Sequence, residues 1–210
     1  MINRKKWLGI LMSTGIFIAF GSSFMRPPKE KRKNVYLRFE NNSPGKVPDS
    51  VISKKSFLQA YKVLMSPRCM NCHPSGNAPL QGEDSHIHTQ GVLRGQDGKG
   101  MYALKCSNCH QPKNTPGPGM PPGNPKWQLP PESTKMVFQG KTPRQLAAQL
   151  LNSKENGGKN KAALIDHVTN DTLVAAGWHP AQGLTLPPLS HAEFAKQFKQ
   201  WLDKGAYLPD

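Results

Sequence analysis

Residues 69–73 read Cys-Met-Asn-Cys-His and residues 106–110 read Cys-Ser-Asn-Cys-His, so one five-residue frame occurs twice. The two frames contain all four cysteines of the 210-residue chain: Cys69, Cys72, Cys106 and Cys109. Cysteines with this spacing lie on one side of a helical turn, where both thiols can add to the two vinyl groups at the edge of a haem. The histidine that follows, His73 or His110, then lies under the macrocycle as the proximal iron ligand. The sequence therefore predicts two covalently attached haem c groups.

Paired CxxC cysteines also occur in structural zinc sites and in disulfides. A zinc site would leave both trailing histidines as a coincidence, with odds on the order of one in a few thousand. A CxxC disulfide is redox-labile and a poor structural link. Covalent haem is the interpretation that the motifs favour.

The N-terminal segment is typical of an export signal. A basic cluster at residues 4–6 precedes an uncharged run over residues 7–20, and small residues favour cleavage after Gly21. The run can be extended to Met25, which would make a marginal membrane anchor and is the alternative. The basic residues just beyond it oppose translocation. Because haem c is attached outside the cytoplasm, we expect residues 1–21 to direct export to the periplasm or to the outer face of the cytoplasmic membrane.

The composition is unusual for a packed domain. The chain has 28 Lys and Arg against 13 Asp and Glu, a formal charge of +15, with 19 Gly, 20 Pro and only 36% hydrophobic residues. This argues against a parallel α/β sheet and against a multi-span membrane protein. Two haem discs would supply the missing apolar surface. The basic surface favours an acidic redox partner protein, and export disfavours nucleic acid.

The remaining chain divides into a flexible basic lead-in over residues 22–50 and a dihaem domain over residues 51–210. The domain is expected to be mostly α with much irregular Pro/Gly-rich loop, its cytochrome c-like helices wrapped around two covalently attached haems. Residues 111–131 hold eight prolines and predict a rigid extended loop. Apolar periodicity and capping residues predict four helices: residues 56–66, a helix starting at Thr142-Pro143, residues 161–168, and a final helix opened by a capping box at residues 190–193.

Methionine could provide a second axial ligand. Met120 lies in a stiff Gly- and Pro-rich segment over residues 117–123, of the kind that presents an axial thioether in monohaem cytochromes. Packing against a haem face or against Trp127 is the alternative. Met101 and Met136 are further methionine candidates.

Histidine is the other candidate for this ligand. His86 and His88 are two residues apart, so an extended segment would direct both to one side. A polar surface loop beside Asp84 is the alternative. His167 could face inward from a short helix, although an ordinary partly buried histidine is the favoured interpretation. Because Met/His ligation raises the reduction potential above that of His/His ligation, one haem of each kind would give two unequal centres.

Several stretches resemble a known family. Residues 69–82 read Cys-Met-Asn-Cys-His-Pro-Ser-Gly-Asn-Ala-Pro-Leu-Gln-Gly, and residues 84–88 read Asp-Ser-His-Ile-His. Shorter patterns are Met-Pro-Pro-Gly at 120–123, Asn-Gly-Gly at 156–158 and Leu-Ser-His at 189–191. Together they are similar to small bacterial dihaem c-type cytochromes labelled isoquinoline 1-oxidoreductase subunits.

The likeness extends over residues 57–207. It implies an exported dihaem electron-transfer protein that could accept electrons from a dehydrogenase or a molybdenum hydroxylase. No residue indicates isoquinoline recognition, and no molybdopterin or iron–sulfur pattern is present.

Three functions follow from these motifs. The first is a non-enzymatic electron carrier that exchanges single electrons with partner proteins. The second is a dihaem enzyme of peroxidase type, which needs one haem with an open coordination position. The third is a haem module held at the membrane by an uncleaved N-terminus and docked to an oxidase or dehydrogenase.

Overall fold

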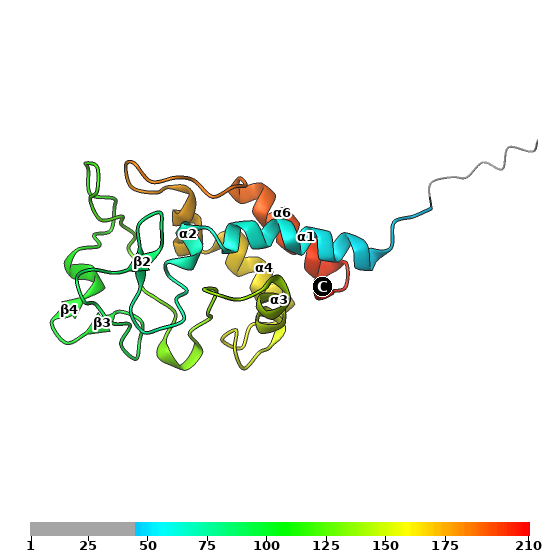
Figure 1. Ribbon diagram of the computed structural model, residues 1–210, viewed down its shortest axis with the longest axis horizontal. Helices are drawn as coiled ribbons and strands as arrows, with labels where there is room; N and C mark the ends of the chain where they lie inside the picture. The colour runs from blue at the N-terminus through cyan, green and yellow to red at the C-terminus, as the bar shows by residue number, and fades with distance from the viewer. Residues whose placement is uncertain (1–44) are drawn as a thin grey trace, which may run out of the picture. The chain divides into compact units, whose positions relative to one another are not determined.

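The computed structural model describes residues 45–210 (Figure 1). The expected signal or anchor over residues 1–21, and residues 22–44 of the expected lead-in, lie outside the described residues. Within residues 45–210, none of the helices has the length and apolar character that a membrane span requires.

Helix α1, Asp49–Leu64, is the central helix of the described chain. Asp49 in its first turn is favourably placed at the positive end of the helix dipole, and the helix begins seven residues before the predicted start at Ser56. Its buried residues recur at helical spacing: Ser53, Ser56, Phe57, Ala60, Val63 and Leu64.

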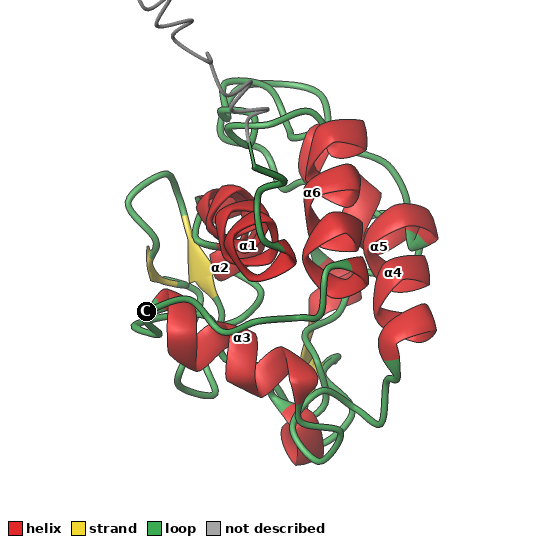
Figure 2. Cartoon of the chain, turned by 90° about the vertical axis from the view of Figure 1, so that its right-hand side faces the viewer, coloured by secondary structure: helices red, strands yellow, loops and turns green. Residues whose placement is uncertain are grey.

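Helix α6, His191–Asp203, packs along α1 (Figure 2). It begins at the predicted residue, because the hydroxyl of Ser190 accepts a hydrogen bond from the backbone N–H of Glu193. Trp201 is fully buried, and its ring centroid lies 4.5 Å from that of Phe57. The aromatic face of α6 therefore meets the apolar face of α1.

Two further helices, α3 (Pro143–Leu151) and α4 (Lys161–Asn170), add buried residues to the core, and the short helix α5 (Thr172–Ala175) follows α4. Helix α3 starts with the predicted Thr142 cap, which forms a capping box with Gln145. Helix α4 contacts α6, and α3 contacts α1 (Figure 2). Phe138, from the loop before α3, joins the same buried cluster.

The other regular elements are short. Helix α2 (Pro67–Met70) follows α1, and two antiparallel hairpins follow α2. The hairpins pair β1 (Leu80–Gln81) with β2 (His86–Ile87), and β3 (Gly100–Met101) with β4 (Leu104–Lys105). Single 3₁₀ turns are η1 (Cys106–Asn108), η2 (Glu132–Thr134) and η3 (Ala176–Trp178).

Residues 111–131 contain no helix or strand, as predicted. The described chain is thus mostly helical in its regular structure, with irregular loops and two small sheets, which confirms the fold class at this level.

Candidate functional site

The first Cys-His motif begins in α2. Pro67 occupies the first turn of this helix, where its missing N–H leaves no bond unmade. The backbone N–H of Cys72 bonds the carbonyl of Cys69 at 3.1 Å, and that of His73 bonds the carbonyl of Met70 at 2.9 Å. These bonds continue the helical turn through the motif, so the two thiols lie one turn apart.

The ring of His73 is fixed on two sides. Its Nδ1 lies 2.7 Å from the backbone carbonyl oxygen of Met136, and the ring stacks on Phe138 with centroids 3.8 Å apart and planes inclined by 11°. Because a carbonyl only accepts, Nδ1 carries the proton and Nε2 keeps its lone pair. Burial lowers the pKa of His73 to about 4, so the ring is neutral at physiological pH. A neutral imidazole with a free Nε2 can bind a metal.

The Met136 carbonyl reaches His73 from a strained backbone. Met136 has φ +47°, in the left-handed region that non-glycine residues rarely adopt. Such a conformation costs on the order of 1–3 kcal/mol and persists only where the surroundings require it. The hydrogen bond between the Met136 carbonyl and the His73 ring is one of the contacts that hold this conformation.

The second motif repeats this arrangement with different residues. Cys106 opens the turn η1, and the N–H of His110 bonds the Cys106 carbonyl at 2.9 Å. The Nδ1 of His110 lies 2.7 Å from the carbonyl oxygen of Pro122, and its ring stacks on Trp127 with centroids 4.2 Å apart and planes inclined by 10°. Burial lowers the pKa of His110 as well.

The four thiols are free. Burial raises the pKa of Cys69 to about 12 and that of Cys72 to about 11, and the second motif's Cys106 adds to the shift of Cys72. The β1–β2 hairpin connects the two motifs, because the N–H of Leu80 bonds the carbonyl of Asn71 and the ring centroid of His88 lies 6.3 Å from that of His110. Within residues 45–210, no three His, Cys, Asp or Glu side chains converge on one point where a metal ion could bind them.

Two guanidinium groups near the first motif have unsatisfied nitrogens. Arg94 is 1% exposed, and its side chain donates to the carbonyls of Pro130 at 2.5 Å and Gly76 at 3.3 Å. Its Nε is buried without a partner, and so is the Nε of Arg68. In the part of the chain that the structure describes, no carboxylate forms an ion pair with Arg94. The charge of Glu132 acts on Arg94 without forming an ion pair, so the buried guanidinium keeps the capacity to bind a further anionic group.

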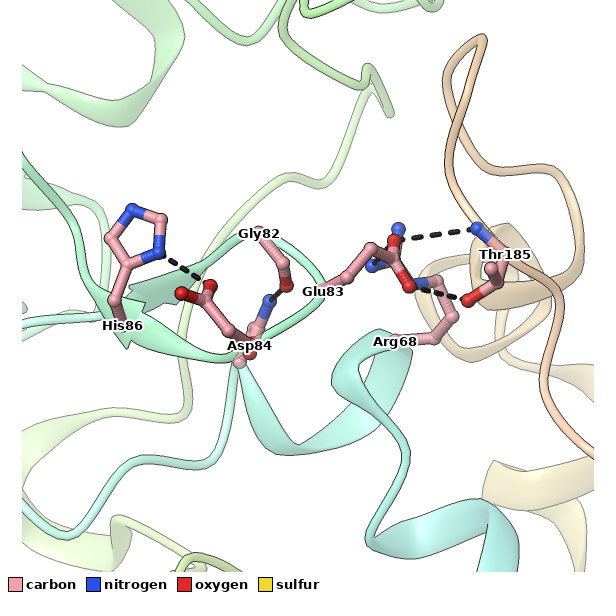
Figure 3. Close-up of polar contacts among 7 residues, drawn as sticks. Arg68, Gly82, Glu83, Asp84, His86 and Thr185 are labelled. Atoms are coloured by element: carbon pink, nitrogen blue, oxygen red, sulfur yellow. Dashed lines mark hydrogen bonds and ion pairs between the residues drawn. The ribbon is translucent and has the colours of Figure 1, made fainter.

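Glu83 connects three distant segments beside this region (Figure 3). It accepts a hydrogen bond from Nη2 of Arg68 at 2.6 Å and another from the hydroxyl of Thr185. The turn between β1 and β2 is thereby tied to α2 and to the loop before α6.

The structure gives the predicted distal histidines different surroundings. His86 is exposed, with Nδ1 2.6 Å from Asp84 (Figure 3). Its Nε2 lies 3.0 Å from the amide of Gln81. Strand β2 ends at Ile87, so His88 leaves the extended segment. The ring centroid of His88 lies 6.3 Å from that of His110, at an interplanar angle of 61°.

The other two candidates for a distal ligand are His167 and Met120. His167 lies on α4, where its Nδ1 is 3.1 Å from a carboxylate oxygen of Asp171. Helix α4 packs in the same buried cluster as Phe138, the residue stacked on His73. Met120 is 42% exposed on the loop whose Pro122 carbonyl bonds His110.

A cavity of about 570 Å³ lies next to the second motif. Cys106 and Trp127 line it, together with three exposed lysines: Lys99, Lys105 and Lys126. This volume is typical of cofactor and ligand sites. The sequence did not predict this cluster, because Lys99 and Lys105 belong to the β3–β4 hairpin whereas Lys126 comes from a loop about twenty residues further along the chain.

A scan against models of protein families, a search of curated proteins and a search of solved structures each found no match to this chain. Its function is therefore inferred from its own residues.

Proposed function

We propose that this chain is an exported dihaem c-type cytochrome that carries single electrons between redox proteins. The observation that carries the proposal is the matching environment of His73 and His110. Each ring has its Nδ1 2.7 Å from a backbone carbonyl and one face on an aromatic ring, which leaves Nε2 available. Metal-binding histidines almost always donate their other ring N–H in this way, because the bond fixes both tautomer and orientation.

The cysteines would hold the two groups covalently. Each thiol sulfur forms a bond to the inner carbon of a haem vinyl group, and the thiol hydrogen goes to the terminal carbon, so no electrons are gained or lost. Cys69 and Cys72 would hold the first haem, and Cys106 and Cys109 the second. Arg94, with Arg68 beside it, would bind the negatively charged propionates, which satisfy buried guanidinium nitrogens that otherwise have no partner.

When bound, each haem exchanges one electron between Fe(II) and Fe(III), taking it from a reduced partner protein and passing it to an oxidised one. The hairpin bonded to Asn71 of the first motif carries His88, whose ring centroid lies 6.3 Å from that of His110, and this closeness of the two motifs supports transfer between the two centres. Lys99, Lys105 and Lys126 around the cavity favour a partner that is acidic at its docking face. The family resemblance supports a dehydrogenase or a molybdenum hydroxylase as the donor.

The test is expression of the full chain in bacteria able to mature c-type cytochromes, followed by intact-mass measurement and a haem absorbance assay. We expect the added mass of two haems in the natural sequence and of one in the double variant Cys106→Ser/Cys109→Ser. Ser107→Ala, a change inside the same motif that touches no thiol, is the matched control and should keep both haems. Protein without haem mass, or with stoichiometric zinc, would overturn the proposal.

Electron carriage is tested separately with the loaded protein. Reduction by an acidic redox protein should slow as salt concentration rises, because ions screen the attraction. Lys126→Gln should slow it at low salt, while Lys154→Gln, a lysine outside this cavity, should not. If the rates do not depend on salt or on Lys126, the proposed docking face is wrong.

A further inference from the structure

We propose that His88 is the second axial ligand of the iron held by His110, so that the second haem has two histidine ligands. This inference rests on the proposed function, since it concerns how this chain's residues would hold that group.

The separation of the two rings fits a shared metal. An imidazole nitrogen lies about 2.0–2.1 Å from a metal it binds and roughly 1.1 Å from its own ring centroid, so two imidazoles on opposite sides of one metal have centroids about 6–6.5 Å apart. The centroids of His88 and His110 are 6.3 Å apart. The stacked rings at the two motifs are much closer, at 3.8 Å and 4.2 Å.

An edge-to-face contact between aromatic rings can also have this separation. The hydrogen bonding of His88 distinguishes the two arrangements. All seven histidines lie within residues 45–210, and six of them have a ring nitrogen near a polar partner. His88 has none there, and its Nδ1 is buried. A buried ring nitrogen without a partner is costly, and iron bound at Nδ1 itself would satisfy it, whereas iron bound at Nε2 would leave it unpaired.

The backbone fixes His88 in this place. Its N–H donates to the carbonyl of Pro79 at 2.9 Å, next to the β1–β2 pairing, and its carbonyl accepts from Gly91 at 3.3 Å. The turn of this hairpin is held in addition by Glu83. An axial ligand on a fixed hairpin keeps its geometry through a change of iron oxidation state, which favours rapid electron exchange.

The competing ligands are less suited to this iron. Both ring nitrogens of His86 already have partners, because Nδ1 pairs with Asp84 and Nε2 lies 3.0 Å from the amide of Gln81. Met120 belongs to the loop that bonds Nδ1 of His110, whereas a second ligand must approach from the Nε2 side. His167 lies on α4, which packs in the buried cluster of Phe138, the residue stacked on His73.

The experiment uses the full-length, haem-loaded protein and the variants His88→Ala, His88→Met and His86→Ala. Low-temperature EPR and near-infrared magnetic circular dichroism of the oxidised natural protein should show a low-spin haem with two histidine ligands. After reduction, His88→Ala should bind one more carbon monoxide per chain than the natural protein. His88→Met should move one of the two midpoint potentials upward and leave the other in place. His86→Ala should match the natural protein in all three measurements.

The outcomes separate this inference from the proposed function. A natural protein that carries two haems but shows no bis-histidine signal overturns the role of His88 and leaves the dihaem proposal standing. Unchanged spectra and unchanged carbon monoxide binding in His88→Ala also overturn the role of His88 and leave the dihaem proposal standing. If His88→Ala does not accumulate, the His88→Met potentials and the spectrum of the natural protein still decide. A natural protein without haem overturns both.

Discussion

The imidazole of His73 lies flat against the ring of Phe138, with centroids 3.8 Å apart and planes inclined by 11°. The backbone N–H of Phe138 also donates to the carbonyl of His73 at 2.9 Å. Phe138 is 5% exposed and belongs to the same buried cluster as Phe57 and Trp201. The first motif is therefore packed directly against the helical core.

Phe138→Ala should destabilise the loaded protein strongly. It removes a buried ring from both the core and the face of His73, and such truncations cost about 3–5 kcal/mol. Denaturant unfolding of the natural and variant proteins measures the difference. Phe138→Leu, which keeps most of the volume, is the matched control and should cost less. A loss below about 1 kcal/mol for Phe138→Ala would show that this ring does not support the fold.

Ser53→Ala tests the contact between α1 and the C-terminal segment. The buried hydroxyl of Ser53 donates to the carbonyl of Trp201 at 2.9 Å and accepts from the N–H of Tyr207 at 3.0 Å. The variant leaves the N–H of Tyr207 unpaired, whereas the Trp201 carbonyl still accepts from the N–H of Ala206 at 2.9 Å, so we expect a loss of about 1–3 kcal/mol in unfolding free energy. The control is Ser75→Ala, whose exposed hydroxyl bonds only the Gln139 side chain. Equal stabilities of the two variants would contradict the prediction.

Gly123→Ala should disturb the second motif. A Cβ on Gly123 would lie 2.1 Å from the carbonyl oxygen of Lys113, so the backbone must shift beside the Pro122 carbonyl that holds His110. We expect reduced yield of protein carrying both haems, measured by intact mass. Gly76→Ala is the control, because the nearest atom to its added Cβ is 4.0 Å away. Equal haem content in both variants would show that this close approach is unimportant.

Glu83→Gln should give a pH-dependent loss of stability. Partial burial raises the pKa of Glu83, but the hydrogen bonds from Thr185 and the charge of Arg68 outweigh it, and the pKa lies below its ordinary value of 4.5. A carboxylate with a lowered pKa in the folded state stabilises that state above its unfolded pKa, and this contribution is lost as pH falls through the folded value.

Because the Glu83 side chain is 41% exposed, the expected effect is small, about 1 kcal/mol or less. Unfolding at neutral pH should show the difference between Glu83→Gln and the natural protein, and the difference should shrink in acid. Asp84→Asn removes the exposed partner of His86 and serves as the control at neutral pH. A difference that grows toward low pH would contradict this account of Glu83.

The helix starts were predictable because their signals are local. Thr142-Pro143 and Ser190 mark two N-termini through residues within one turn, and the structure places both helices there. Helix α2 was not predicted, because four residues are too short for apolar periodicity. The start of α1 was predicted too late, because the first residue that this helix buries, Ser53, is polar and adds nothing to the apolar periodicity.

The two motifs were visible in the sequence, but the groups around their histidines were not. Met136 and Phe138 lie more than sixty residues from His73 and carry no pattern that assigns them to it. The position of His88 depends on where strand β2 ends, which pairing in the hairpin determines. Arg94 looks like any other basic residue until its burial is known.

The hydrogen bond that orients His110 spans 12 residues of chain, whereas the one that orients His73 spans 63. Closing the longer segment costs about 1.5 kcal/mol more in chain entropy. Partial unfolding of the helices would consequently break the contact between His73 and the Met136 carbonyl, while the short loop keeps His110 bonded to the Pro122 carbonyl. Heat or a damaging mutation in the helices should thus disorder the first of the two proposed haem sites before the second, and unfolding of the chain would occur in two stages.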